Sequence, residues 1–312
     1  MFEKALEMIR RYDTIVLHVH RTPDGDAFGC LAGMKYLILD NFPDKKVYMV
    51  GDNSERYQFI TGQPMDIIND TVYNGALAII LDTPSREMVA DKRFSRAEAT
   101  LRFDHHIFVE KFADEEFVDS SSESCCGVLT DFAMECKLKM TKRSATALLT
   151  GIVTDSGRFR YDSTTSATFR RASSLMQFDV EILKIYEKLY MTDMESVLLN
   201  ATFALKIKLT EHRAAYIYAT ENELRELGVP ADVAARRFVF TMGDIKGIHI
   251  WALFAESQKG IYCEMRSRDL NVNQIAVKYG GGGHERASGV VLPSQEVVMK
   301  VIRDLDRVAA TV

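Results

Sequence analysis

Acidic and imidazole side chains recur in this sequence at points where apolar runs end. The stretch HVHRTPDGDAFGC, residues 18–30, directly follows the apolar run TIVL and holds two histidines and two aspartates that flank Gly25. A single residue of this kind is unremarkable, because turns and strand ends often carry aspartate or histidine as caps. The whole set is a candidate group of ligands for something positively charged. Its members are His20, Asp24, Asp26, Asp82, Asp104, His105, His106 and Asp155.

Several carboxylates at one edge of a sheet would repel one another and raise each other's pKa unless cations neutralised them. Metal binding is the simplest way to meet that requirement. Mixed imidazole and carboxylate ligands suit Mn²⁺, Fe or Zn²⁺, whereas an all-oxygen set would favour Mg²⁺. Octahedral coordination and availability make Mn²⁺ the first expectation, with Mg²⁺ as an alternative. Six ligands that include one bridging carboxylate would serve two cations roughly 3.5–4 Å apart.

The elements that must position these residues follow the pattern of an α/β domain. Apolar, β-branched runs alternate with helical stretches through the first half, which is typical of a mostly parallel sheet flanked by helices. We expect strands at DTIVLHV, KKVYMV, ALAIILD and ATLRFDH, and helices near residues 29–41 and 144–153. Ligands of such sheets gather outside the carboxyl ends of the strands. Asp82 and the triplet 104–106 lie at two of those ends.

The second half predicts a separate, smaller α+β domain. Residues 176–205 have helical periodicity without Gly or Pro and are interpreted as one or two connecting helices. After them come a strand at AAYIYA, a short helix at ENELRELG, strands at IHIWALFAE and GIYCEMRS, a helix at NVNQIAVKYG, a further strand and a final helix. The expected organisation is a domain over 1–180, a helical connector over 181–204 and a domain over 205–312. The lone Trp251 is most simply a core residue.

Length and composition bound the class of protein. A chain of 312 residues has material for about two domains, and its five cysteines, without a spaced framework, predict reduced thiols. The N-terminal MFEKALEMIRRYD predicts an amphipathic helix and neither a signal peptide nor a membrane span, so we expect a soluble, cytoplasmic protein without a membrane partner. A net charge of -5 and a pI near 5.9 argue against long or duplex nucleic acid, which needs a broad basic face. Any phosphorylated substrate should therefore be small.

Five motifs resemble those of one family. HRTPDGDAFG resembles the first motif of the DHH phosphoesterase superfamily, LDTP and GIVTDSGRF resemble its second and fourth motifs, and FDHH resembles the motif that names it. GGGGHERASG is similar to the signature of the accessory domain called DHHA1. The motifs span nearly the whole chain in the expected order. The resemblance implies an N-terminal DHH domain, a smaller α+β DHHA1 domain and an active site in the cleft between them.

The resemblance also implies a role for each polar residue. Asp104 would orient a histidine, as carboxylates commonly do around metal-bound imidazoles, and His106 would face the substrate phosphate. His18 has no implied role and is expected in the core, while Cys125 and Cys126 are expected to be buried rather than nucleophilic. The implied ligands are His20 and Asp24 for a first cation, Asp26, His105 and Asp155 for a second, and Asp82 for both.

Groups that bind the substrate are expected in the second domain. Four aspartates against two divalent cations leave the metal site near neutrality, so an anionic phosphate needs further donors. A glycine run lets backbone N–H groups approach an anion closely, and an arginine can form a bidentate fork with a phosphate. Without the resemblance, a helix C-cap followed by a flexible loop and an exposed strand arginine would explain these residues at least as well. The expected substrate-binding residues are Arg266, Gly281, Gly282, Gly283, His284 and Arg286.

The expected reaction is hydrolysis of a phosphate ester by water, without a covalent enzyme intermediate. Short two-domain members of the family look like oligoribonucleases that also remove the 3′-phosphate of adenosine 3′,5′-bisphosphate (pAp), so short RNA and small nucleotides are the expected partners. A phosphodiesterase for cyclic di-AMP or pApA is a close alternative. A manganese-dependent pyrophosphatase is less favoured because no SRKKQ-like run is present. A repair-type exonuclease is less favoured because it needs a longer chain. A nucleotide-binding regulator is less favoured because all six expected metal ligands are present. The sequence leaves open whether the chain forms a homodimer.

Overall fold

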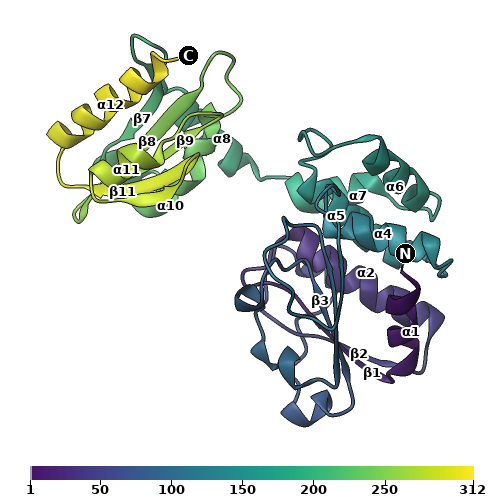
Figure 1. The fold of residues 1–312 in the computed structure, drawn as a ribbon. Coiled ribbons are helices and arrows are strands. Elements are labelled where there is room, and N and C mark those ends of the chain that lie inside the picture. The colour runs from purple at the N-terminus through teal and green to yellow at the C-terminus, as the bar shows by residue number, and fades with distance from the viewer. Residues whose placement is uncertain (1) are drawn as a thin grey trace. The chain divides into compact units, whose positions relative to one another are not determined.

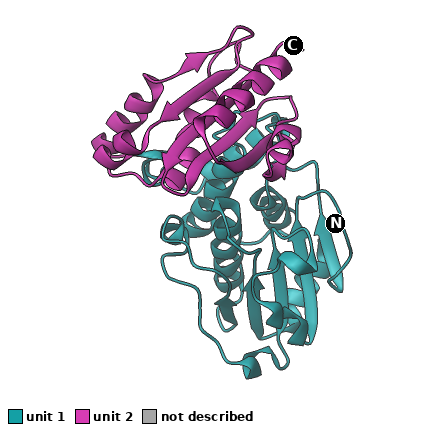
Figure 2. Ribbon diagram, turned by 90° about the vertical axis from the view of Figure 1, so that its left-hand side faces the viewer, with its two compact units in different colours: residues 1–191 teal, residues 192–312 magenta. Residues whose placement is uncertain are grey.

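The computed structural model describes residues 2–312, which form two compact units (Figure 2). The first unit runs to Met191 and the second from Thr192 to Val312. Two helices occupy the segment of uninterrupted helical periodicity: α7 (Ile182–Tyr190) belongs to the first unit and α8 (Met194–Ala204) to the second. Each unit has its own buried apolar clusters.

The first unit is built on a five-stranded parallel sheet with helices packed against it (Figure 1), which confirms the predicted α/β class. The strand order is β2-β1-β3-β4-β5, and every neighbouring pair is parallel. The edge strand β5 (Glu115–Val118) was not expected, because its four residues are half-buried and begin with two glutamates rather than an apolar run. The four expected strands are β1 (Thr14–His18), β2 (Lys46–Met49), β3 (Leu77–Leu81) and β4 (Ala99–Asp104).

The two faces of this sheet are covered differently. Successive side chains of a strand point to opposite faces, so Ile15 and Leu17 of β1 enter the larger core while Val16 joins a smaller cluster with Tyr73. On that second face short 3-10 turns, such as η1 (Asp70–Tyr73), take the place of long helices. The helices that share the larger core are α1 (Glu3–Arg11), α2 (Gly25–Asn41), α3 (Gln58–Thr61), α4 (Cys125–Glu135), α5 (Lys142–Asp155), α6 (Ser166–Met176) and α7.

Helix α2 starts at Gly25, four residues before the expected start at Gly29. The reason is a side-chain cap: one carboxylate oxygen of Asp24 accepts hydrogen bonds from the backbone N–H groups of Asp26 at 3.0 Å and Ala27 at 3.1 Å. Such a cap satisfies donors that the first helical turn leaves free. It also fixes Asp24 and Asp26 at the amino end of the helix, close to the carboxyl end of β1.

A glycine in α2 lets this helix approach α5 closely. A Cβ on Gly29 would lie 2.8 Å from the carbonyl oxygen of Ala147 and 3.1 Å from the Cα of Gly151. Because both obstacles are backbone atoms of α5, the helices would have to move apart to admit a side chain. This contact fixes the distance between the helices that carry Asp26 and Asp155.

Gly29→Val is expected to lower the free energy of unfolding by about 3 kcal/mol, the upper range for overpacking a filled core. The measurement is a urea unfolding curve followed by circular dichroism. Gly282→Val is the control, because Gly282 has an ordinary φ and no atom within 4 Å of its Cβ position; its effect should stay within about 0.5 kcal/mol. Equal stability of the two variants would contradict the close helix contact.

The second unit contains a six-stranded mixed sheet in the order β10-β11-β9-β8-β7-β6. Strands β7 and β8 pair in parallel and the other neighbours are antiparallel. Trp251 is 6% exposed and packs in the apolar cluster on one face, as a core residue should. The strands are β6 (Lys208–Leu209), β7 (Ala215–Ala219), β8 (Ile250–Ser257), β9 (Gly260–Ser267), β10 (Gly282–His284) and β11 (Ala287–Leu292).

Helices cover both faces of this second sheet, in agreement with the predicted α+β domain. One face packs against α8, α9 (Glu221–Glu226) and α10 (Ala231–Phe238), and the other against α11 (Asn273–Lys278) and α12 (Gln295–Ala309). Among residues 2–312, no helix combines the length and the apolar character that a bilayer crossing requires.

Candidate metal centre

The predicted ligands of the first unit gather at one edge of its sheet. The order 2-1-3-4-5 reverses between β1 and β3, and in open parallel sheets ligands bind outside the carboxyl ends of the strands at such a point. His20 follows β1 and Asp82 follows β3, while β4 ends in the Asp104-His105-His106 triplet. The remaining carboxylates come from the amino end of α2 and from the last residue of α5.

Three overlapping groups made only of Asp and His side chains at this edge have the spacing of metal ligands. Within each group the candidate ligand atoms lie no more than 4.8 Å apart. Asp82 and His105 each belong to two groups, so the three groups form one continuous cluster. The groups are His20, Asp24 and Asp82; Asp26, His105 and Asp155; and Asp82, His105 and His106.

The three histidines of the cluster are held in the same way. The Nδ1 atom of His20 lies 2.8 Å from the carbonyl oxygen of Arg21, and the Nδ1 atom of His105 lies 3.3 Å from that of Ser122. The Nδ1 atom of His106 lies 2.7 Å from a carboxylate oxygen of Asp104. Because these oxygens accept hydrogen bonds, each Nδ1 must carry the proton, and each Nε2 is left for a cation or a substrate.

Asp82 lies at the middle of the cluster and has a buried oxygen without a hydrogen bond. The residue is 2% exposed, and among residues 2–312 its Oδ1 atom has no hydrogen-bond partner; the His105 Nε2 atom is 3.5 Å away. Its Oδ2 atom lies 3.6 Å from Nε2 of His20. A buried carboxylate oxygen in this state is costly unless a cation neutralises it, so the residues present fit a metal ion.

Protonated histidines balance the charge of Asp82 in the absence of metal. Burial alone would raise the pKa of Asp82, but His105 and His20 outweigh it and hold that pKa below its usual range. Burial opposes protonation of the histidines, but the carboxylate of Asp82 raises the pKa of His20 to about 9 and, with Asp26, that of His105 to about 10.

Two further carboxylates are crowded into the same place. Asp26 is 1% exposed and accepts hydrogen bonds from the backbone N–H groups of Cys125 at 2.7 Å and Cys126 at 3.0 Å, at the amino end of α4. Burial, followed by the charges of Asp82 and Asp155, raises the pKa of Asp26 well above its usual value. Burial and neighbouring aspartates likewise raise the pKa of Asp155 to about 7, against the opposing effect of His105. Divalent cations would relieve this crowding.

Sequence reasoning missed a buried arginine that supports His106. Arg102 is fully buried, and its Nη2 atom donates to Asp104 at 2.5 Å and to the carbonyl oxygen of Pro84 at 3.1 Å. Its Nη1 atom donates to the carbonyl oxygen of Glu110 at 3.1 Å. Since Asp104 also binds His106, a chain of contacts runs from Arg102 to the imidazole. The available signal was the spacing i, i+2 within one strand, which places Arg102 and Asp104 on the same face.

The residues that we expect to be neither metal ligands nor nucleophiles are buried. His18 is fully buried, with its Nε2 atom 3.3 Å from the hydroxyl of Tyr73, and burial lowers its pKa to about 4, so it remains neutral. Cys125 and Cys126 are also fully buried, and burial raises the pKa of Cys125 to about 12. A thiol with such a pKa stays protonated and is a poor nucleophile.

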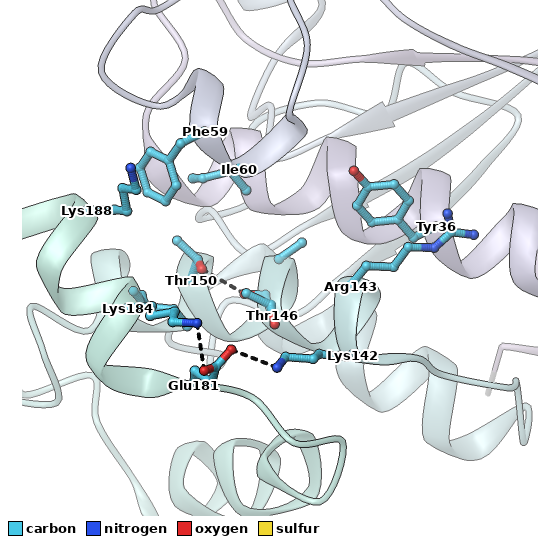
Figure 3. A pocket seen from close by; sticks show the side chains of 12 residues that line it. Tyr36, Phe59, Ile60, Lys142, Arg143, Thr146, Thr150, Glu181, Lys184 and Lys188 are labelled. Carbon is cyan, nitrogen blue, oxygen red and sulfur yellow. Dashed lines mark hydrogen bonds and ion pairs between the residues drawn. The ribbon is translucent and has the colours of Figure 1, made fainter.

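A nearby cavity of the first unit has different chemistry. This cavity of about 280 Å³ lies among α2, α3, α5 and α7 (Figure 3). Its carboxylate, Glu181, lies 2.7 Å from the ammonium of Lys142 and 2.8 Å from that of Lys184. No histidine lines it, and its carboxylate is already neutralised. The cluster of Asp and His side chains that could hold a metal in the first unit is therefore at the sheet edge and not in this cavity.

In the second unit, the expected substrate-binding residues lie on β9, on and just before β10, and on the turn between β10 and β11, the strand that pairs with both. Arg266 of β9 is paired with Ala287 of β11, and the backbone N–H of Ser267 donates to the carbonyl oxygen of Arg286 at 3.1 Å. His284 and Arg286 are exposed at the turn between β10 and β11. Arg266 is less free, because its Nη1 atom donates to Glu264 at 2.9 Å and to its neighbouring backbone carbonyl at 2.8 Å.

The glycine run forms a hairpin strand, β10, which sequence reasoning did not anticipate. A Cβ on Gly281 would collide with the carbonyl oxygen of Gly289, and a Cβ on Gly283 would lie 2.5 Å from that of Ala287. Gly283 also has a φ of +140°, which side chains rarely adopt. The tight β10–β11 hairpin thus explains why glycine is needed at positions 281 and 283. Gly282, by contrast, has open space beside it.

Comparison with known proteins places both units in one family. Residues 14–152 match the N-terminal domain of the DHH family, and residues 216–311 match the DHHA1 domain. The fold and the site thus define a two-domain protein of the DHH phosphoesterase type. The chain belongs to the DHH family, as its similarity to the following relatives also shows.

The chain is similar over nearly its full length to curated bacterial proteins. It is 33% identical to a probable bifunctional oligoribonuclease and PAP phosphatase, NrnA, of Streptococcus mutans, over 92% of each chain. It is 31% identical to the bifunctional oligoribonuclease and PAP phosphatase NrnA of Bacillus subtilis, over 98% of each. A solved exopolyphosphatase-related protein from Bacteroides fragilis shares the fold, with a TM-score of 0.80 and 22% identity over 98% of this chain and 95% of that one.

Proposed function

We propose that the chain is a metal-dependent phosphoesterase that hydrolyses very short oligoribonucleotides to mononucleotides and pAp to AMP and phosphate. The observation that carries this proposal is the cluster at the carboxyl edge of the sheet, where a buried oxygen of Asp82 lies without a hydrogen bond among imidazoles and other carboxylates. The names of the two NrnA relatives support the choice of substrate. A relative named cyclic-di-AMP phosphodiesterase, GdpP of Geobacillus thermodenitrificans, is more distant at 26% identity, so cyclic di-AMP is less favoured.

Divalent cations fit the donor set of the cluster, and Mn²⁺ is our first choice because imidazole nitrogen and carboxylate oxygen are mixed. When bound, such cations make a water molecule more acidic and neutralise charge on a phosphoryl group. The chain's contribution is to hold the donors in place. The proposed ligands are His20, Asp24, Asp26, Asp82, His105 and Asp155.

His106 and Asp104 have a separate role in this proposal. Asp104 holds the Nδ1 proton of His106, so that the opposite nitrogen faces away from the carboxylate. Asp104 also raises the pKa of His106, which favours an imidazolium that can donate a hydrogen bond to a phosphate oxygen. Charge that develops on the phosphoryl oxygens would be stabilised by this donor.

The proposed function is tested by a substrate panel. Purified protein with Mn²⁺ is incubated with pAp, pApA, 5-mer RNA, cyclic di-AMP and pyrophosphate, and the products are separated by chromatography. We expect turnover of pAp and of the shortest RNA. Preferred cleavage of cyclic di-AMP would overturn the proposed substrate, and inactivity on every substrate would favour a nucleotide-binding regulator.

Five free cysteines support a reducing, cytoplasmic location for this activity.

Binding of Mn²⁺ is expected to release protons. At pH 7 the metal-free centre holds protonated His20 and His105, with pKa values of about 9 and about 10, and a cation can bind only the neutral imidazoles. The apparent affinity for Mn²⁺ should therefore rise with pH from about pH 6 to about pH 9. Calorimetric titrations at pH 7 in two buffers with different ionisation enthalpies measure the released protons. Identical heats in both buffers would contradict this site.

In the second unit, we propose Arg266, His284, Arg286 and the residues Gly281 to Gly283 as substrate-binding groups. Arg266→Ala is expected to lower kcat/KM for dinucleotides by about tenfold more than for an aryl phosphate ester, because the small ester lacks the second nucleotide that the guanidinium would hold. Arg225→Ala, at an exposed position of α9, is the control. Equal losses on both substrates would argue against this role.

A further inference from the structure

A pocket of about 150 Å³ lies beside the metal centre within the first unit. Thr154, the residue before Asp155, lines this pocket, and its side chain lies 2.5 Å from where a Cβ on Gly25 would be. Gly25 in turn separates Asp24 from Asp26. The pocket and the proposed metal centre therefore share a wall. We call it the arginine–tyrosine pocket after six of its lining residues: Arg56, Tyr57, Arg158, Arg160, Tyr161 and Tyr190.

The arginine–tyrosine pocket has an excess of positive charge. It contains three guanidinium groups and no Asp or Glu. Among residues 2–312, none of the three arginines forms an ion pair with a carboxylate within 4.0 Å, and the guanidinium of Arg160 donates only to the backbone carbonyl of Gly157, at 3.2 Å. In the 280 Å³ cavity, by contrast, Glu181 neutralises two of the lysines. Unpaired cations gathered in one hollow favour an anionic ligand.

Two arginines of the pocket lie against aromatic rings that also line it. The guanidinium of Arg158 lies 4.5 Å from the ring centre of Tyr190, and that of Arg56 lies 5.2 Å from the ring centre of Tyr57. Burial raises the pKa of Tyr190, and the nearby phenols of Tyr57 and Tyr161 add to this effect against the charge of Arg158. Tyr161 is 58% exposed, so much of its surface is accessible to a ligand. Aromatic rings beside cationic groups are how proteins bind nucleotides along a single strand.

A tight loop that begins directly after Asp155 presents these side chains. Gly157, Arg158 and Phe159 are consecutive left-handed residues, with φ values of 56°, 63° and 62°. The ring of Tyr161 occupies the space where Gly157 lacks a side chain. Two consecutive non-glycine residues in this conformation are strained, and such strain is concentrated at functional sites. The loop thus ties the position of Arg158 and Tyr161 to that of Asp155.

We propose that the arginine–tyrosine pocket is a nucleotide subsite that holds the residue next to the scissile phosphate of a short oligoribonucleotide. In this arrangement the arginines bind a non-scissile phosphate and Tyr161 stacks on the base. The volume of about 150 Å³ is below the roughly 300 Å³ of sites that enclose whole ligands, so it suits one base and not a dinucleotide. The inference deepens the proposed function and rests on it for the identity of the substrate.

The first test measures binding without turnover. Calorimetric titration of pApA in EDTA compares the full-length wild-type protein with the variant R158N/R160A. Asparagine is chosen at position 158 because it tolerates the left-handed backbone. We expect the double variant to bind pApA at least about tenfold more weakly, since two charge-assisted hydrogen-bond donors are lost. Arg170→Ala, which removes an exposed arginine of α6 outside the pocket, should bind as the wild type does.

The second test examines stacking. The affinity for pApA is compared with that for an analogue lacking the second base, in the wild type and in Tyr161→Ser. We expect the wild type to lose about 5- to 100-fold in affinity when the base is absent, and the variant to show little difference between the two ligands. Tyr161→Phe, which keeps the ring, should restore the wild-type preference.

These outcomes separate the subsite from the proposed function. If the wild type binds pApA but does not hydrolyse it with Mn²⁺, the proposed function fails while the subsite stands. If R158N/R160A binds pApA as tightly as the wild type, or if neither protein binds it, the subsite is wrong. Unchanged base preference in Tyr161→Ser would remove the stacking role and leave only the phosphate contact.

Discussion

Replacing Asp82 with asparagine is expected to lower kcat/KM for pAp and for short RNA by at least about 10³-fold, because the cations' stabilisation of transition-state charge is worth several kcal/mol. Asp82 is the carboxylate shared by two of the three ligand groups, and the amide has no charge to neutralise a cation. The loss should appear in Mn²⁺ affinity as well as in turnover. Steady-state kinetics and calorimetric titration with Mn²⁺ measure the two effects.

Asparagine is a conservative choice at this position for a reason of backbone geometry. Asp82 has a φ of +49°, and besides glycine, aspartate and asparagine are the residues that most readily adopt the left-handed region. The variant should therefore fold, and its circular dichroism and melting temperature should remain close to those of the wild type. Asp70→Asn, which removes one charge from an exposed turn of the same unit, is the control. An Asp82→Asn enzyme with more than a tenth of the wild-type kcat/KM would contradict the bridging role.

Much of the metal centre could be predicted from the sequence because local rules determine it. The apolar runs of β1, β3 and β4 end at His20, Asp82 and Asp104, and parallel strands must present their carboxyl ends at one edge. The choice among many acidic residues came from the family resemblance, since aspartates at turns are common. The distance between Asp26 and Asp155 could not be predicted from the sequence, because it depends on how closely α2 packs against α5.

The features that were missed depend on contacts between distant segments. The hairpin strand β10 was hidden because four glycines carry no strand pattern, and their pairing with β11 decides the conformation. The capped start of α2 was placed four residues late because Asp24 was read as a ligand and not also as an N-cap. The arginine–tyrosine pocket joins residues 56–57, 154–161 and 189–190, and no local pattern connects these segments.

The buried Arg102 shows the same limit and leads to the largest expected effect on stability. A sequence pattern assigns an arginine within a strand to the exposed face, but here the guanidinium is fully buried and pairs with Asp104, also fully buried, at 2.5 Å. Arg102→Met should therefore lower the free energy of unfolding by about 3–5 kcal/mol, because it removes the guanidinium from the buried carboxylate of Asp104, which keeps only His106, and from that of Glu116. Urea unfolding followed by circular dichroism measures this loss.

A double variant distinguishes the ion pair from simple packing. If the cost of Arg102→Met comes from the charge of Asp104 that has lost the guanidinium, then R102M/D104N should be more stable than Arg102→Met alone, because the carboxylate is gone. Arg96→Met, at an exposed arginine that pairs with Asp70, is the control and should cost less than about 1 kcal/mol. If the double variant is no more stable than Arg102→Met, lost packing against Phe112, whose ring centre lies 4.7 Å from the guanidinium, explains the effect instead. In either case His106 loses part of its support, because the carboxylate that holds its Nδ1 proton is itself held by Arg102.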